Sequence, residues 1–241
     1  MVILEGKGLT KSFDGNKIIE NVSLNLKKGE IVSLLGVSGV GKTTLFNLLS
    51  GLDVPDTGEV YLNGEAVTGM PGKVGYMQQS DLLLPFKTTL ENVMIPLILK
   101  GVDKKEAKAR AEAILTEFSL FESRSLYPGK LSGGMRQRAA LARTFLTGCS
   151  VFLLDEPFSA LDALTRGEMQ RWFRNVIKEK GASGVFITHD VDEAILLSDR
   201  IYILSGEVGS ITAEVQVELK ERDAFESEFI ELKKAILEKV K

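Results

Sequence analysis

Apolar and polar positions along the chain follow two different spacings, which together predict a mixed α/β protein. Largely apolar runs at 30–36, 151–156 and 184–189 are typical of buried strands, because a strand covered on both faces carries apolar residues at successive positions. Residues 2–13 and 17–27 instead alternate like strands on either side of a turn at "DGN". Shorter strands are predicted at 58–64, 74–79 and 199–204.

Helical spacing, with apolar residues three and four positions apart, recurs between these strands. It predicts helices at 41–51, 163–180 and 190–198. Residues 88–147 have helical spacing and little strand character, so we expect a helical insert there. The alternation of apolar strands with helices predicts a parallel sheet with helices on both faces.

Near the end of the chain, five apolar residues stand three or four positions apart: Phe225, Phe229, Leu232, Ile236 and Val240. They predict a helix that packs on its own domain. A dimer seam is the alternative, but the pattern barely exceeds two heptads and is short for a coiled coil.

Composition narrows the class of protein. A chain of 241 residues with 44% hydrophobic residues suits one α/β domain or a domain with a lobe, and its net charge of −3 lacks the basic excess typical of nucleic-acid-binding proteins. We find no signal-peptide pattern and no window near the ~20 apolar residues that cross a bilayer, so we expect a soluble protein, for which any membrane role has to come through a partner. Cys149, the single cysteine, excludes an internal disulfide and is expected to be a small buried residue.

The stretch "GVSGVGKT" at 36–43 matches the phosphate-binding pattern G-x-x-x-x-G-K-[ST], with a predicted strand before it and a predicted helix after it. Glycines in such a loop let backbone N–H groups converge on phosphate oxygens, the lysine reaches the β- and γ-phosphates, and the threonine hydroxyl binds Mg²⁺. The predicted nucleotide contacts are Gly36, Ser38, Gly39, Val40, Gly41, Lys42, Thr43 and Thr44.

Two carboxylates end the apolar strand "VFLLDE". Asp155 is the candidate for holding Mg²⁺, through water, and Glu156 stands one step further along the chain, where it can face an attacking water as general base. The alternative is a pair of solvated loop acids.

A second glycine-rich stretch, "LSGGMRQR" at 131–138, opens a predicted helix whose N-terminus suits an anion. It resembles the signature sequence of ABC-type ATPases, with Met135 where the family usually has glutamine. The resemblance implies a P-loop (RecA-like) nucleotide-binding core with an antiparallel β subdomain and an inserted α-helical subdomain. It also implies that two copies pair head-to-tail, so that Ser132, Gly133 and Gly134 of one copy meet the ATP held by the phosphate loop of the other.

The same resemblance divides the chain, 1–241, as one ABC ATPase domain. Residues 1–87 and 149–222 correspond to the catalytic core with its β subdomain, 88–148 to the helical subdomain and 223–241 to a C-terminal helix.

Further roles follow from the resemblance at matching positions. Phe13 corresponds to an aromatic ring stacked on adenine, although a core aromatic on a strand is the alternative. Gln79, preferred over Gln78, corresponds to a glutamine that approaches the metal and the water and faces the membrane partner. Asp162 is the acid of the loop "SALD" that crosses the dimer, and His189 bridges the γ-phosphate and Glu156.

The predicted function is the ATP-binding and ATP-hydrolysing subunit of a bacterial or archaeal ABC importer. The stretches "EPFSALDALTR" and "THDVDEAILLSDRI" are similar to the nitrate, sulfonate, taurine and thiamine-precursor importer group. The implied cofactors are ATP and Mg²⁺. The implied partners are a second copy of the chain, transmembrane permease subunits and a solute-binding protein, with no nucleic acid, which places the chain at the cytoplasmic face of the membrane.

The permease contact is expected around Gln79–Pro85 and the first helix of the insert, whose apolar residues outnumber one core face; their packing as internal core is the alternative. Two other functions stay open: a regulatory or force-transmitting module of an envelope complex, and a non-transport ABC ATPase acting on nucleic acid.

Overall fold

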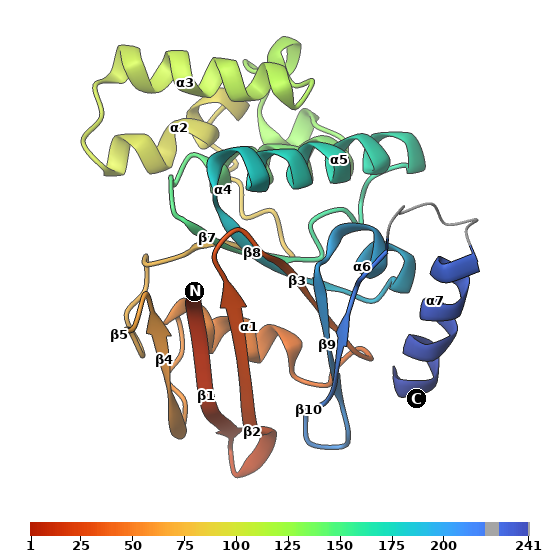
Figure 1. Ribbon diagram of the computed structural model, residues 1–241. Helices are drawn as coiled ribbons and strands as arrows, with labels where there is room; N and C mark the ends of the chain where they lie inside the picture. The colour runs from red at the N-terminus through yellow and green to blue at the C-terminus, as the bar shows by residue number, and fades with distance from the viewer. Residues whose placement is uncertain (220–226, 241) are drawn as a thin grey trace.

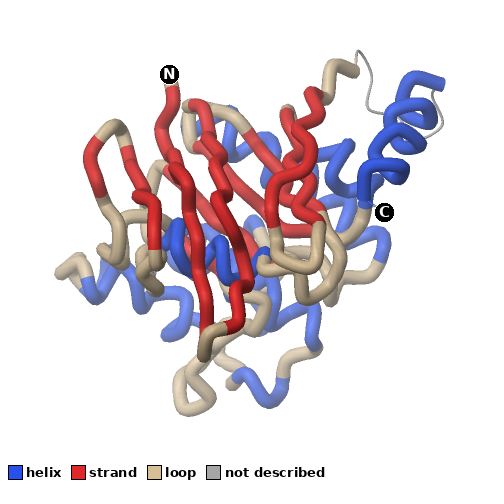
Figure 2. The backbone as a smooth tube through the Cα atoms, turned by 90° about the horizontal axis from the view of Figure 1, so that it is seen from below, coloured by secondary structure: helices blue, strands red, loops and turns tan. Residues whose placement is uncertain are grey.

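The structure is a computed structural model that describes residues 1–219 and 227–240. It contains two sheets (Figure 1). The smaller sheet has the strand order β2-β1-β4-β5 and is antiparallel throughout, with β1 at Val2–Phe13, β2 at Asn16–Lys27, β4 at Thr57–Leu62 and β5 at Glu65–Ala66. The long hairpin of β1 and β2 runs through the centre of Figure 2.

The turn between β1 and β2 explains why this hairpin forms. Asp14 has φ 50° and Gly15 has φ 79°. Positive φ at both central residues is typical of a two-residue turn whose twist matches that of the flanking strands, and Asp-Gly is among the dipeptides that adopt it most readily.

The larger sheet has the order β10-β9-β3-β8-β7-β6. Its parallel part consists of β9 (Arg200–Ser205), β3 (Ile31–Leu35), β8 (Ser183–Thr188), β7 (Val151–Asp155) and β6 (Gly75–Met77). Every residue of β3, β7 and β8 is buried, as the apolar runs predicted for a sheet covered on both faces. Because these strands run in parallel, the segments that follow β3, β7 and β8 emerge at one edge.

Helices cover both faces of the larger sheet. Helix α1 (Lys42–Ser50) lies between the two sheets and buries Leu45, Phe46 and Leu48 in a core shared with both. Helix α5 (Ala163–Lys180) covers the other face, and α6 (Val191–Leu197) follows β8 directly.

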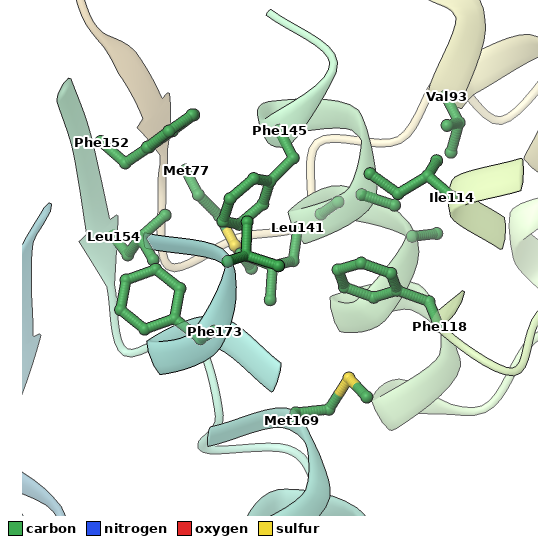
Figure 3. Close-up of a cluster of buried hydrophobic side chains, with 14 of the residues drawn as sticks. Met77, Val93, Ile114, Phe118, Leu141, Phe145, Phe152, Leu154, Met169 and Phe173 are labelled. Carbon is green, nitrogen blue, oxygen red and sulfur yellow. The ribbon is translucent and has the colours of Figure 1, made fainter. Parts of the chain in front are cut away.

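The helical insert comprises α2 (Thr89–Leu99), α3 (Lys104–Glu117) and α4 (Gly133–Phe145), with 3-10 turns at Phe121–Ser123 and Pro128–Lys130. Its core is continuous with that of the sheet (Figure 3). Phe145 of α4 stacks on Phe152 of β7 with ring centroids 4.6 Å apart, and it also meets Phe173 of α5 edge-on at 6.1 Å. The C-terminal end of α4 is therefore anchored in a core that the insert and the sheet share.

Two strands and one residue differ from expectation. The short β5 and the antiparallel edge strand β10 (Ser210–Gln216) were not predicted, because neither carries an apolar run. Edge strands bury one face at most, so their sequence signal is weak. Cys149 is half-buried in the turn before β7, whereas we expected a buried residue.

The last helix, α7 (Ser227–Val240), packs on its own chain. Phe229 is 1% exposed and Ile236 is fully buried, in a cluster with residues of α6 and β9. Leu232 and Val240 pack against the same cluster, and Lys233 pairs with Asp192 of α6 at 2.7 Å. Phe225 and the segment 220–226 lie outside the described residues. Within the described residues, no helix combines the length and the apolar character that a membrane span needs.

Neighbouring residues of α7 give a matched test of this packing. Ile236→Ala is expected to lower the free energy of unfolding by about 2–5 kcal/mol, because it leaves a cavity in a fully buried position. Leu237→Ala is expected to stay within about 0.5 kcal/mol of the wild type, because Leu237 is 43% exposed. Urea denaturation measures both, and equal losses would show that α7 packs through a different face.

Candidate active site

A cavity of about 200 Å³ lies at the ends of β3, β7 and β8. Its lining comes from the phosphate loop, the start of α1, strands β2 and β8, the end of β7 and the segment after β6. It consists of Ile18, Ser38, Gly39, Gly41, Lys42, Thr43, Thr44, Gln79, Asp155, Glu156 and Ile187. Sites that enclose a whole small-molecule ligand usually have volumes of roughly 300–1,000 Å³. The cavity is therefore large enough for the phosphates of a nucleotide, and the base and sugar have to be covered by other residues.

Close packing shapes the loop. Gly41 has φ 103°, and a Cβ there would lie 2.5 Å from Cγ2 of Ile19. A Cβ on Gly36 would lie 2.3 Å from the carbonyl oxygen of Leu204, so this residue is a glycine because β9 passes directly behind it. Gly36 and Val40 do not line the cavity, and the Val40 side chain is 6% exposed in the core beneath the loop.

Lys42 and the start of α1 give the cavity its positive charge. The Lys42 ammonium is 2.8 Å from each of two carbonyl oxygens of the loop, those of Gly36 and Val37. Burial lowers the pKa of Lys42, and the nearby carboxylates of Glu156 and Asp155 oppose that shift. The open N–H groups at the N-terminus of α1 add a partial positive charge, so the cavity fits a phosphate chain.

Thr43 and Asp155 form a pair of oxygen ligands at the floor of the cavity. The Thr43 hydroxyl donates to Oδ2 of Asp155 at 2.8 Å, and Asp155 is 2% exposed. Burial raises the pKa of Asp155, and the Thr43 hydrogen bond opposes the shift. A hydroxyl and a carboxylate beside a phosphate site are the hard oxygen donors that Mg²⁺ prefers.

Glu156 brings the three predicted catalytic residues together. Its Oε2 accepts from Nε2 of Gln79 at 3.3 Å, and its Oε1 lies 3.1 Å from Nδ1 of His189. Gln78 does not line the cavity, whereas Gln79 does. Glu156 has φ 49°, a left-handed conformation that a residue with a Cβ rarely adopts, and its N–H donates to the carbonyl oxygen of Ile187 at 3.1 Å.

The signature residues stand apart from this cavity. Ser132 begins α4 and its hydroxyl accepts from the N–H of Met135 at 3.2 Å, but neither it nor Gly133 nor Gly134 lines the phosphate cavity. Gly133 instead lines a separate groove of about 450 Å³ that also reaches Gln79.

Two further predicted residues lie outside the cavity. Asp162 precedes α5, where its Oδ1 accepts from the N–H of Thr165 at 3.1 Å, and this hydrogen bond lowers the pKa of Asp162. Phe13 is 45% exposed at the end of β1, so it is not a core aromatic, and the ammonium of Lys11 lies 5.1 Å from its ring centroid.

This geometry agrees with the comparison to known proteins, in which residues 19–159 match a family described as ABC transporter. The chain belongs to the ABC transporter family. It is 46% identical over 200 residues to the formylaminopyrimidine import ATP-binding protein of Halalkalibacterium halodurans, covering 83% of this chain and 78% of that protein. It is 41% identical over 235 residues to an aliphatic sulfonates import ATP-binding protein of Shouchella clausii, covering 97% of this chain and 89% of that protein.

Solved structures support the same family. A dimeric ATP-binding cassette in a post-hydrolysis state, bound to ADP and Pi, superposes with a TM-score of 0.84 at 32% identity, covering 90% of this chain and all of that one. The P-loop ABC fold is thereby confirmed, and the chain is an ATP-binding ATPase of the ABC transporter family.

Several site residues of this ABC ATPase were missed by the sequence analysis. Ile18 and Ile187 line the phosphate cavity, but an isoleucine on a strand has no signal that separates a cavity wall from core. Gln137 of α4 is 6% exposed and its Nε2 donates to the carbonyl oxygen of Glu156 at 2.8 Å. A glutamine between two arginines in a helix gives no sign that it is buried.

A second, smaller cavity of about 70 Å³ lies behind Glu156 and His189, and it reaches α5 and α6. Glu193 of α6 lines it, is 8% exposed, and accepts from Nε2 of Gln170 at 2.9 Å. Burial raises the pKa of Glu193, and the negative charge of Asp190 raises it further. Hydrogen bonds from Thr188 and Gln170 and the positive charge of Arg166 oppose this rise.

The left-handed turn at Glu156 predicts an unusual order of stabilities. Glycine is expected to be more stable than alanine at this position by about 1 kcal/mol, because only glycine adopts the positive φ without strain. Both Glu156→Gly and Glu156→Ala remove the carboxylate, so urea denaturation of the two variants without nucleotide isolates the backbone effect. An alanine variant as stable as the glycine variant would show that the turn is unstrained.

Glu193 predicts a pH dependence of stability. Because its pKa is raised in the fold, its contribution to stability is largest below the unfolded pKa of 4.5 and is lost as the pH rises through the folded pKa. The stability of the wild type relative to Glu193→Gln should therefore fall as the pH rises from about 4.5. Urea denaturation at a series of pH values measures this difference, and a difference that grows in favour of the wild type would contradict it.

Proposed function

We propose that this chain is the ATP-hydrolysing subunit of an ABC importer and that two copies enclose ATP between them. The observation that carries the proposal is the separation of the two anion sites within one chain. The phosphate cavity contains Lys42, Asp155 and Glu156, whereas Ser132 and Gly134 of the same chain do not line it. A second copy that presents its signature helix completes the site.

Within each copy, the phosphate loop holds the triphosphate. Gly39 and Gly41 allow backbone N–H groups to face the phosphates, whereas Gly36 lets the loop pack on β9, and Lys42 neutralises the phosphate charge. Thr43 and Asp155, with Gln79 nearby, would hold Mg²⁺, which would neutralise phosphate charge when bound. Ser38 and Thr44 add polar contacts along the same wall.

Glu156 is the residue that acts on water. Its carboxylate stands between Gln79 and His189 at the rim of the cavity and accepts the proton of the attacking water. His189 lies beside this carboxylate, with Nδ1 3.1 Å from Oε1 of Glu156, which leaves its other ring nitrogen, Nε2, for the γ-phosphate side. Gln79 donates to the other carboxylate oxygen, so the carboxylate is oriented from both sides.

The second copy contributes Ser132, Gly133 and Gly134. The N-terminus of α4 is exposed at Ser132 and Gly133, and it presents a serine hydroxyl and open N–H groups to a γ-phosphate. Asp162 lies in the 159–162 segment that crosses between copies. The small volume of the phosphate cavity supports this arrangement, as does the dimeric state of the related cassette that binds ADP and Pi.

An apolar groove on the helical insert is the proposed contact with the permease. It has a volume of about 520 Å³ and is lined by Leu84, Lys87, Glu91, Met94, Ile95, Ile98, Leu99 and Lys104. Leu99 is 82% exposed, and Phe86 beside the groove is 72% exposed. Leu84 in the groove is five residues along the chain from Gln79, which contacts Glu156, so this short segment links the proposed permease contact to the site.

The names of the relatives support an importer. In the proposed assembly, a solute-binding protein lies outside the membrane and this chain lies at the cytoplasmic face. Their names include import of formylaminopyrimidine, of aliphatic sulfonates and, for a Pseudomonas aeruginosa relative that is 41% identical, of spermidine and putrescine. Similar cassettes thus serve chemically different solutes, so the choice of solute belongs to the other subunits.

Glu156→Gln tests the shared site. This variant is expected to bind ATP with Mg²⁺, to lose hydrolysis, and to accumulate as a dimer, because ATP that is not cleaved keeps the two copies joined. Size-exclusion chromatography with saturating ATP and Mg²⁺ measures the dimer. Lys42→Ala in the same background is the control, and it is expected to remain monomeric because it removes the main phosphate contact.

A second change in the same background separates a shared site from a site closed by one chain. Ser132→Arg is expected to abolish the dimer while leaving ATP binding intact, because Ser132 is exposed and does not line the phosphate cavity of its own chain. Loss of ATP binding in the Ser132→Arg monomer, or a dimer that persists despite the arginine, would overturn the shared site.

A further inference from the structure

The side-chain amide of Gln137 joins the signature helix to the segment that carries Glu156. It lies in the second turn of α4 and is 6% exposed. Its Nε2 donates to the carbonyl oxygen of Glu156 at 2.8 Å and to the hydroxyl of Ser159 at 3.2 Å. Its Oε1 accepts from the N–H of Ala160 at 2.9 Å. All of these partners belong to the short segment 156–160 that follows β7.

The backbone of Glu156 needs these contacts. With φ at 49°, it holds a conformation that is unfavourable for a residue with a Cβ. Its N–H is fixed by Ile187 of β8, and its carbonyl oxygen accepts from Gln137 and, at 3.1 Å, from the hydroxyl of Ser159. The direction of the Glu156 side chain follows from this backbone, so these bonds determine where the carboxylate stands relative to Gln79 and His189.

A second contact ties the first turn of α4 to the same segment. A Cβ on Gly134 would lie 3.1 Å from Cδ2 of Leu161 and 3.2 Å from the carbonyl oxygen of Ala160. The helix therefore approaches the 156–161 segment closely at Gly134 and is hydrogen-bonded to it at Gln137. The same helix begins at Ser132, so the position of Ser132 and the backbone of Glu156 are parts of one packed unit.

We propose that Gln137 is a positioning residue for ATP hydrolysis, which holds Glu156 in its left-handed turn and links its orientation to that of α4. This inference rests on the proposed function, in which Glu156 acts on water and Ser132 meets the nucleotide held mainly by the second copy. Under that function, the buried amide connects the carboxylate of one ATP site to the signature of the other. Movement of α4 when the dimer closes or opens then reaches Glu156 through Gln137.

Gln137→Met tests the inference in the full chain, because methionine has a similar length and cannot form these hydrogen bonds. The kcat for ATP hydrolysis is expected to fall by about 10²-fold, the scale of a catalytic group displaced by about 1 Å. The KM for ATP with Mg²⁺ and the affinity for ATP are expected to stay close to wild type, since Gln137 does not line the phosphate cavity.

Two more variants separate hydrogen-bond donation from packing. Gln137→Glu keeps an acceptor for the N–H of Ala160 but removes the donor to Glu156, so it is expected to lose kcat as Gln137→Met does. Ser159→Ala removes the other side-chain donor to the Glu156 carbonyl from an exposed position, so it is expected to show a smaller loss of kcat without a loss of fold.

Thr144→Val is the matched control in the same helix. Thr144 is 4% exposed, and its hydroxyl donates to the carbonyl oxygen of Ala140 within α4, away from the 156–160 segment. It is expected to keep wild-type kcat, and thermal unfolding of every variant shows whether helix stability explains any loss.

Wild-type kcat in Gln137→Met and Gln137→Glu would overturn the inference, and so would an equal loss in Thr144→Val. If Gln137→Met fails to fold, Gln137→Glu and Ser159→Ala still decide the question. Glu156→Gln is measured alongside. Full turnover in that variant would overturn the proposed function, whereas an inactive Glu156→Gln with an unimpaired Gln137→Met would overturn the role of Gln137 alone.

Discussion

A carboxylate has to stand at the end of a fully buried parallel strand and still reach the rim of a cavity, and the left-handed turn at Glu156 achieves this. Asp155, one residue earlier, points into the cavity floor, where it is 2% exposed and bonded to Thr43. In an extended strand the next side chain would point to the opposite face of the sheet. The positive φ at Glu156 redirects the chain, so that two adjacent acids serve the same cavity from different depths.

The strain of that turn is offset by the packing around it. The N–H of Glu156 bonds to β8 and its carbonyl oxygen bonds to α4, so a central strand and a helix of the insert both hold the turn. The insert is able to do this because its core is continuous with the core of the sheet, through Phe145 and Phe152 (Figure 3). The helical insert therefore holds the backbone of Glu156 and also carries the apolar groove proposed for the permease.

Charge is arranged so that the cavity favours a phosphate chain. Lys42 is desolvated, Asp155 is buried, and the burial of each disfavours its charged form. Phosphate oxygens carry the charge opposite to that of Lys42, and a cation carries the charge opposite to that of Asp155. These attractions compensate for the water that the two side chains lost on burial, and they contribute to the free energy of nucleotide binding. The signature residues lie at another helix N-terminus outside this cavity, which is why the proposed site needs a second copy to complete it.

The sequence by itself determined the elements whose signal is local. The loop at 36–43 is identified by its glycines, Lys42 and Thr43. The apolar runs of β3, β7 and β8 indicate a sheet that is buried on both faces. The ends of two of these runs place Asp155, Glu156 and His189 at the ends of strands. Only the tertiary structure decided that Gln137 is buried against Glu156, that Ile18 lines the cavity, that Phe13 is exposed, and that β10 closes the edge of the sheet. The physical reason is that periodicity reports whether a position faces the interior, whereas the identity of its neighbour depends on packing between segments far apart in the chain.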